Sequence, residues 1–178
     1  MQDISLHILD IAENSIRADA GSIEILVTRN SDRDVLVVEV RDDGRGMDAD
    51  TLARIRDPFF TTKHKKTGLG IPFLSQSAEQ AGGSIMVESE PGKGTTVRAT
   101  FRWNHIDRPA VGNLVETLIT LIAGHPDLDI RYREDDNGRT FCFDTREIKS
   151  QLGDVPISVP AALFAVRQLL QDEIRIKG

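Results

Sequence analysis

The sequence predicts an α/β (α+β) protein in which helices and strands are interspersed along one chain. Apolar residues recur at helical spacing near the N-terminus, and two runs rich in β-branched residues follow at 22–28 and 35–40. Glycine- and proline-containing turns separate the later segments. Of the 178 residues, 39% are hydrophobic and 28% are charged, which is typical of a globular chain and not of a disordered one.

The first helix is expected to begin after Asp3, a suitable N-cap, because Ile4, Ile8, Ile11 and Ser15 follow at helical spacing. The segments SIEILVT and VLVVEV are predicted to form a hairpin closed by the loop NSDRD.

The next elements are read from their turn residues. DADTLARIRD predicts a short helix that ends at Pro58, and IPFLSQSAEQA (71–81) predicts a longer one stopped by Gly82-Gly83. SIMVES and TTVRATFRW are predicted strands joined by the turn EPGKG.

The composition changes at NHIDRP (104–109), so we expect two parts, residues 1–104 and 105–178. The second part predicts a helix, the hairpin strands DIRYRE and RTFCFD around Asn137-Gly138, and two further helices capped by Asp144 and Ser158. The apolar side of its first helix consists of Val115, Leu118, Ile119 and Ile122. Two interpretations stay open for it: a small α+β domain that recognises a partner or dimerises, or an extension packed against the sheet.

Charge and composition exclude several classes of protein. Residues 1–104 carry 13 basic and 16 acidic side chains and residues 105–178 carry 9 and 12, so neither part has the positive charge of a nucleic-acid-binding protein. No segment has the length of a membrane span and the start is unlike a signal peptide, so we predict a cytoplasmic location. The single cysteine, Cys142, is expected to be buried in TFCF.

The first helix carries two polar pairs at four-residue spacing. Asp10 and Asn14 project from one face, and Glu13 and Arg17 are expected to pair beside them. One interpretation is a solvated polar face. The other is a Mg²⁺–nucleotide site, in which an amide oxygen ligates the metal and a carboxylate orients water.

The segment RDDGRGM follows the second strand directly. Gly44 and Gly46 permit tight backbone geometry beside a flat ligand, and Asp42 offers an acceptor for an exocyclic amine such as that of adenine. The alternative is a plain turn. The segment also matches a loose dinucleotide-binding fingerprint, but that motif needs an acidic ribose ligand about 20 residues later, where this chain has TTKHKK. RDDGRGM does not match a calcium-binding loop either, because Gly44 stands where an oxygen ligand is required.

Residues 57–71, DPFFTTKHKKTGLGI, predict a hinged lid over a ligand. Its two phenylalanines would hold it to the core, its lysines would form a mobile cationic segment, and its glycines would end it at a helix start. Gly68 and Gly70 bracket Leu69 at a helix start, where backbone N–H groups and the helix dipole form a seat for phosphate. A flexible basic loop is the alternative.

Five motifs follow one another in this order: DIAENSIRADA, DDGRGM, DPFFTTK, TGLG and GGSIMVESEPGKGTT. On these motifs, the chain over about residues 3–103 resembles the ATP-binding domain of the histidine-kinase-like (GHKL) superfamily. That superfamily includes sensor histidine kinases, gyrase, Hsp90 and the mismatch-repair ATPases. The resemblance implies a Bergerat fold, a two-layer sandwich with helices on one face of a mixed sheet. The later motifs are most similar to sensor kinases, and ENSIRADAGSIEI is equally similar to the mismatch-repair branch.

The resemblance also implies roles for individual residues, with ATP and Mg²⁺ as cofactors. Asn14 matches the Mg²⁺-ligating asparagine, Asp10 the position of the catalytic acid, and Asp42 the adenine-binding aspartate. The remaining matches are Arg17 for phosphate, Gly44 and Gly46 for the adenine pocket, Lys63 for the lid, Thr67, Gly68, Leu69 and Gly70 for the second glycine box, and Thr95 for a water-mediated adenine contact. Lys66 replaces the first glycine of the kinase pattern.

None of the four histidines lies in a phosphoacceptor pattern of the sensor-kinase kind. The resemblance therefore implies a stand-alone Mg-ATP-binding kinase or ATPase that acts on a separate protein partner or a phosphoacceptor in trans, with a homodimer as a further option. Two alternatives stay open: an ATP-switched binding module without phosphotransfer, and an ATPase closer to the mismatch-repair branch.

Overall fold

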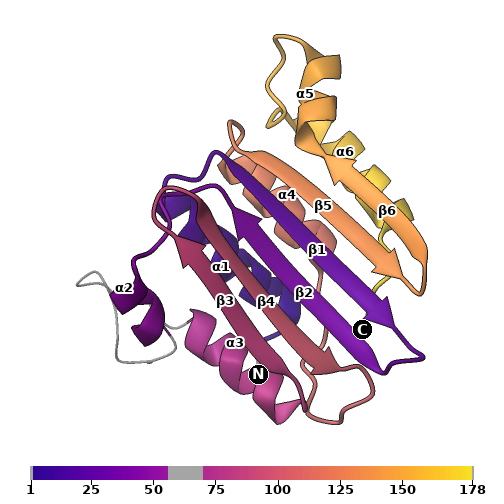
Figure 1. Ribbon diagram of the computed structural model, residues 1–178. Helices are drawn as coiled ribbons and strands as arrows, with labels where there is room; N and C mark the ends of the chain where they lie inside the picture. Colours follow the sequence, from indigo (N-terminus) through magenta and orange to yellow (C-terminus); the bar gives the residue numbers. More distant parts are fainter. Residues whose placement is uncertain (1, 56–69, 178) are drawn as a thin grey trace.

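The computed structural model describes residues 2–55 and 70–177. Its centre is a mixed six-stranded sheet with the order β3-β4-β2-β1-β5-β6 (Figure 1). The strands are β1 Ser22–Asn30, β2 Val35–Asp42, β3 Ser84–Glu90, β4 Gly94–Arg102, β5 Asp129–Asp136 and β6 Arg139–Asp144. Neighbouring strands run antiparallel, except β1 and β5, which are parallel.

Helices cover one face of this sheet. The helices of the described residues are α1 Ile4–Arg17, α2 Ala49–Arg54, α3 Gly70–Gln80, α4 Leu114–Gly124, α5 Thr145–Leu152 and α6 Pro160–Glu173. Figure 1 shows α1, α3, α4 and α6 behind the sheet, with α5 beyond one end of it. The predicted two-layer α/β sandwich is therefore confirmed. No helix among the described residues is long and apolar enough to cross a membrane.

The core lies between these two layers. Along β1, the side chains of Ile23, Ile25 and Val27 are buried at every second position, as the period of a half-buried strand requires. They join one hydrophobic cluster with Ile8 of α1 and Ile130 of β5. Removal of this apolar area from water is the main stabilising contribution, at about 25 cal/mol per Å².

The opposite face of the sheet carries charge. Glu39 of β2 is 3% exposed and forms ion pairs with Arg41 and with Arg98 of β4, whose guanidinium groups reach the solvent. A buried carboxylate is tolerated here because both cations neutralise it.

Residues 105–178 continue the same sheet and share its core. β5 pairs with β1 from Ser22↔Asp129 to Arg29↔Asp136, and the Arg29 guanidinium donates to both Asp136 carboxylate oxygens at 2.6 and 2.7 Å. The expected boundary at 104/105 falls in the connection between β4 and α4. In that connection the Trp103 ring contacts both Arg29 and Arg108, whose guanidinium carbons are 4.9 and 4.2 Å from its centroid.

The helix caps were predicted with one error. The Asp3 carboxylate accepts from the Leu6 N–H at 2.9 Å and Asp144 accepts from the Arg146 N–H at 2.9 Å, so both predicted caps are confirmed. Ser158 is not the cap of α6. The helix begins one residue later, after Val159 and without a side-chain cap, and Pro160 at its first position has a backbone angle φ that already suits a helix.

The predicted burial of Cys142 is wrong, because its side chain is exposed. It lies on β6, the edge strand of the sheet, opposite Arg133 of β5. Side chains alternate between the two faces of a strand. Since Phe143 is buried beneath the helices, its neighbour Cys142 faces the other side.

The last described residues are held by a buried carboxylate. Glu134 of β5 accepts from the Tyr132 hydroxyl at 2.8 Å and from the Arg175 backbone N–H at 2.7 Å. Ile174 and Ile176 on either side of Arg175 are buried. The segment after α6 is thereby attached to the sheet. Burial beside the Glu134 carboxylate also raises the pKa of the Tyr132 hydroxyl well above its ordinary value.

His7 is the exception among the buried polar side chains of α1. Its side chain is 1% exposed, and neither ring nitrogen has a hydrogen-bond partner among the described residues. Burial lowers the pKa of its imidazole below the ordinary value of 6.5, against the opposing fields of Asp10 and Asp3. The folded state therefore favours the neutral ring.

We expect His7→Leu to flatten the acid branch of the stability curve. Below about pH 6.5 the unfolded chain takes up a proton that the folded chain resists, so the wild type loses stability as the pH falls through this range. The check is the melting temperature at about pH 7.5 and about pH 5.5. His105→Leu, at a partly exposed histidine, is the control. An unchanged pH dependence in His7→Leu would contradict this account.

Candidate functional site

Three chain segments meet at the carboxylate of Asp42, the last residue of β2. Its Oδ2 accepts from the Ser15 hydroxyl of α1 at 2.6 Å. Its Oδ1 accepts from the backbone N–H groups of Gly44 at 2.9 Å and Thr95 at 3.2 Å. The orientation of the carboxylate is therefore set by helix, loop and neighbouring strand together. The side chain is only partly buried, so a ligand can reach it.

The register of the sheet explains this meeting. Asp42 pairs with Thr95 at the end of the β2–β4 ladder, so the start of β4 lies directly beside it. Ser15 is 3% exposed and extends the buried side of α1 formed by Ile8 and Ile11. A hydroxyl at a core-facing position needs a partner, and the Asp42 carboxylate, at 2.6 Å, is nearer to it than the Ile11 carbonyl oxygen, at 3.2 Å.

Two glycines of the site stand where no side chain fits. Gly46 has φ +67°, and a Cβ there would lie 2.0 Å from the Glu90 carbonyl oxygen. Gly94 has φ +93°, and its Cβ would lie 1.9 Å from the carbonyl oxygen of Asp42. Both values are left-handed, and both contacts are far below van der Waals distance. These glycines allow the loop after β2 to pack on the β3–β4 turn.

Gly44 has the same role toward α1. A Cβ on Gly44 would lie 2.8 Å from the carbonyl oxygen of Ala18, just past the end of the helix. That carbonyl accepts from the Arg45 N–H at 2.9 Å. The loop thereby forms a backbone-lined wall beside Asp42, of the kind that a flat ring can approach closely.

Ser89 of β3 joins the remaining parts of this wall. Its hydroxyl accepts from the Met47 N–H at 2.8 Å and donates to the Gly94 carbonyl oxygen at 3.0 Å. It also lies 2.8 Å from the Thr95 hydroxyl. Thr95, predicted to support the purine, is thus held beside Asp42 by both its backbone and its side chain.

Asp10 and Asn14 occupy one face of α1, as their spacing predicted. The N-terminal residue of α3, Gly70, lies against this face: a Cβ there would be 3.2 Å from the Asp10 Cβ and 3.9 Å from the Asn14 Nδ2. Asp10 Oδ2 accepts from the Gln2 amide at 2.9 Å. Because Ser15 follows Asn14, the Asp42 cluster and the start of α3 flank the same two turns of α1.

The predicted pair between Glu13 and Arg17 does not form. The Arg17 guanidinium donates instead to the Asn14 Oδ1 at 2.7 Å, three residues back on the same helix. Glu13 contacts the His125 Nε2 at 3.2 Å, at the end of α4. Tertiary packing of α4 on α1 supplies a partner that the spacing within one helix cannot reveal.

The donor set of α1 suits a hard cation together with an anionic ligand. Amide and carboxylate oxygens lie one turn apart at Asn14 and Asp10, and the residue that faces them, Gly70, has no side chain of its own. In the described part of the chain, no three His, Cys, Asp or Glu side chains are grouped as metal ligands. A metal here would draw its other ligands from phosphate and water, as Mg²⁺ commonly does.

Four of the predicted site residues, Lys63, Thr67, Gly68 and Leu69, lie outside the described residues. Of the others, the structure brings Asp42, Gly44, Gly46 and Thr95 together as one cluster and places Asp10, Asn14, Arg17 and Gly70 along the adjoining face of α1.

Sequence reasoning missed three residues that build the site. Ser15 and Ser89 bind the side chain of Asp42 and the loop after it, and Asp43 Oδ1 accepts from the N–H groups of Gly21 and Ser22 at 2.9 and 2.8 Å. Only Ser15 leaves a signal in the sequence, as a polar residue at a core-facing helical position.

We expect Gly46→Ala to destabilise the protein more than Gly92→Ala. Both glycines have positive φ, +67° and +77°, so both substitutions carry the backbone penalty of about 1–2 kcal/mol. Only at Gly46 would the new Cβ also meet a backbone carbonyl, whereas nothing lies within 4 Å at Gly92. Urea denaturation of the three proteins measures the difference. Equal losses of stability would show that the loop can move away from Glu90.

Comparison with known proteins agrees with this geometry. The family model described as "Histidine kinase-, DNA gyrase B-, and HSP90-like ATPase" matches residues 2–105. Sporulation kinase E of Bacillus subtilis (strain 168) is 39% identical over 95 residues, which cover 52% of this chain and 13% of that protein. Sensor histidine kinase ZraS of Escherichia coli (strain K12) is 39% identical over 89 residues, 50% of this chain and 19% of that one.

Among solved structures, the N-terminal domain of a DNA repair protein superposes with a TM-score of 0.56 at 13% identity, over 80% of this chain and 52% of that one. At this identity the likeness concerns the fold alone. Since 80% of this chain exceeds the part matched by the family model, the shared fold extends into the segment after residue 105. The matched residues, 2–105, include each described site residue, and the chain belongs to the family of histidine kinase-, DNA gyrase B- and HSP90-like ATPases.

Proposed function

We propose that this chain binds ATP with Mg²⁺ between α1, the loop after β2 and the start of α3, and that it uses the bound nucleotide to act on a separate protein. The observation that carries the proposal is the Asp42 carboxylate, held by Ser15, Gly44 and Thr95 beside a backbone-lined wall. Membership of an ATPase family supports the same assignment.

The purine end of the site is selective for adenine. Asp42 Oδ1 already receives two N–H donors, whereas Oδ2 receives one hydroxyl and retains acceptor capacity. The exocyclic amine of adenine is a donor and complements that oxygen. Guanine presents a carbonyl oxygen at the same ring position, and an acceptor facing a carboxylate is repelled.

The phosphate end lies along α1. Asn14 would hold the metal through its amide oxygen, and Mg²⁺, when bound, neutralises charge on the phosphates. Arg17, which donates to Asn14 Oδ1, is a cation within reach of the same place, and triphosphate offers it stronger acceptors than an amide. The N–H groups at the start of α3 add positive potential next to Gly70.

The phosphate would leave for a partner and not for His7. His7 is 1% exposed, so its ring cannot receive a phosphoryl group in the folded state. Both curated relatives reported above are named kinases, and this chain spans 13% and 19% of their lengths. A phosphoryl acceptor on another protein fits this assignment. Phosphoryl transfer depends mainly on positioning the reactants and stabilising charge, and the residues of this site can do both.

Hydrolysis is the second candidate function, favoured by the acid at position 10. The Asp10 carboxylate lies on the same face of α1 as Asn14, beside Gly70 and hydrogen-bonded to the Gln2 amide. A carboxylate placed there can orient water toward a terminal phosphate. The segment ENSIRADAGSIEI, which resembles the mismatch-repair ATPases, supports the same alternative.

Asp42→Asn is expected to weaken ATP binding by about 10- to 100-fold, the effect of losing a charged hydrogen-bond partner. It should also reduce the preference for ATP over GTP, because the amide can turn an N–H toward the guanine carbonyl. Titration calorimetry with each nucleotide and Mg²⁺ provides the measurement. Asp32→Asn, in the exposed turn between β1 and β2, is the control. Unchanged affinity in Asp42→Asn would refute the placement of the purine.

Asn14→Ala is expected to abolish the Mg²⁺-dependent part of ATP binding and any turnover, while metal-free adenosine binding persists at Asp42. Incubation with ATP labelled in the γ-phosphate separates the activities: label on a partner indicates a kinase, and steady phosphate release indicates an ATPase. In the second case Asp10→Asn should stop release without loss of binding. Nucleotide binding with neither outcome would indicate an ATP-switched binding module.

A further inference from the structure

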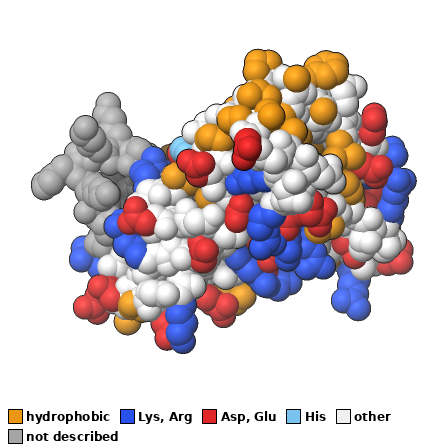
Figure 2. All heavy atoms as spheres, turned by 90° about the horizontal axis from the view of Figure 1, so that it is seen from above, with side chains coloured by type: hydrophobic (Ala, Val, Ile, Leu, Met, Phe, Trp, Pro, Cys, Tyr) orange, Lys and Arg blue, Asp and Glu red, His pale blue; other side chains and the backbone are white. Residues whose placement is uncertain are grey.

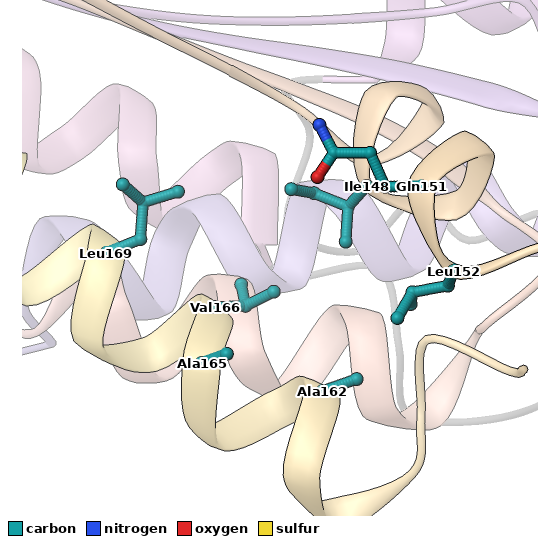
Figure 3. A pocket seen from close by; sticks show the side chains of 7 residues that line it. All are labelled: Ile148, Gln151, Leu152, Ala162, Ala165, Val166 and Leu169. Atoms are coloured by element: carbon teal, nitrogen blue, oxygen red, sulfur yellow. The ribbon is translucent and has the colours of Figure 1, made fainter.

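Helices α5 and α6 enclose an apolar groove outside the candidate nucleotide site. It has a volume of about 240 Å³ and is lined by Ile148, Gln151, Leu152, Ala162, Ala165, Val166 and Leu169. Figure 3 shows these side chains projecting from the two helices toward the space between them. Gln151 contributes the single polar side chain of the lining, so the floor of the groove offers mainly hydrophobic contact.

The apolar surface continues from the groove onto the outer side of α6. Ala161, Phe164, Ala165 and Leu169 are all exposed there and follow one another at helical spacing. Phe164 is 65% exposed and Leu169 is 40% exposed, and Val155 after α5 is 49% exposed. Figure 2 shows hydrophobic side chains gathered on the part of the molecule where α5 and α6 lie. A continuous apolar patch of this kind marks an interaction surface more often than a free one.

The unpaired charge on α5, on α6 and on the loop between them is negative. From α5 to the end of α6, every basic side chain is paired: Arg146 with Asp144, Lys149 with Asp129, and Arg167 with Glu116. In the same segment four carboxylates form no ion pair or hydrogen bond with any described residue, namely those of Glu147, Asp154, Asp172 and Glu173. Glu147 lies one turn before Gln151 on α5, and Asp172 lies one turn after Leu169 on α6, so helical spacing places negative charge next to the lining residues.

We propose that the α5–α6 groove binds an amphipathic helix of a partner protein, with apolar side chains one turn apart and Lys or Arg residues on both flanks. Helix-in-groove binding uses this combination of an apolar floor and a complementary charged rim. A second copy of this chain fits less well. A symmetric contact places the same patch of both copies together, so each acidic rim would face another acidic rim.

The groove is separate from the proposed nucleotide site. The two share no residue: α5 packs on β5 and α6 on α4, whereas the nucleotide site is formed by α1, α3 and the ends of β2 and β4. Partner binding is therefore testable without nucleotide, and its failure would leave the assignment of ATP binding unaffected.

The test uses a fluorescent synthetic 18-residue helix with leucine at every third or fourth position and lysine on the flanks, titrated with the full chain by anisotropy. We expect binding to weaken about tenfold in Leu169→Gln, which removes apolar contact from the groove. Met86→Gln, at a 45%-exposed side chain on β3, is the matched control and should bind like the wild type. Thermal melts establish that both variants fold.

The charge requirement has its own measurement. The combined variant Glu147→Gln, Asp154→Asn and Asp172→Asn should bind the peptide more weakly and with a shallower salt dependence, and a glutamate-flanked peptide should not bind. Equal binding of the two peptides, equal loss in Met86→Gln, or no binding up to about 1 mM would overturn the proposal. So would a dimer in sedimentation that Leu169→Gln converts to a monomer, since the occupant would then be a second copy.

Discussion

The structure depends on the way β2 ends. Its last residue, Asp42, projects a carboxylate that receives a hydroxyl from α1, an N–H from its own loop and an N–H from β4. Three segments distant in sequence are thereby joined at one partly buried carboxylate. Without these three donors, only water could hydrogen-bond to it. The same carboxylate keeps acceptor capacity for a ligand, so the group that organises this end of the sheet is also the one proposed to select the nucleotide.

Close backbone contact is the second constraint, and it follows from the first. The loop after β2 can reach α1 on one side and the β3–β4 turn on the other only because residues 44, 46 and 94 have no side chain. The result is a wall of backbone on one side of Asp42 and a helix face with Asp10 and Asn14 on the other. Main-chain packing therefore fixes most of the polar atoms of the proposed site, and only a few side chains contribute to it directly.

The second half of the chain adds a layer of contacts without disturbing this site. Its strands extend the sheet through β1, and its helices continue the hydrophobic layer from α4 to α6. The outward side of α6 remains apolar and its rim acidic, in a protein whose other described helices direct most of their large apolar side chains inward. The proposed partner groove is therefore separate from the proposed nucleotide site.

Local sequence determined the order and the limits of most elements, the caps at Asp3 and Asp144, and the polar face shared by Asp10 and Asn14, because spacing within one helix or strand decides which side chains point together. The tertiary structure alone decided which distant segments meet. It placed β5 parallel to β1, gave Glu13 the partner His125 in place of Arg17, turned Cys142 to the open face of an edge strand, and recruited Ser15 and Ser89 to the site. The physical reason is that strand pairing and side-chain partners across elements depend on contacts between residues far apart in the chain, which no local pattern encodes.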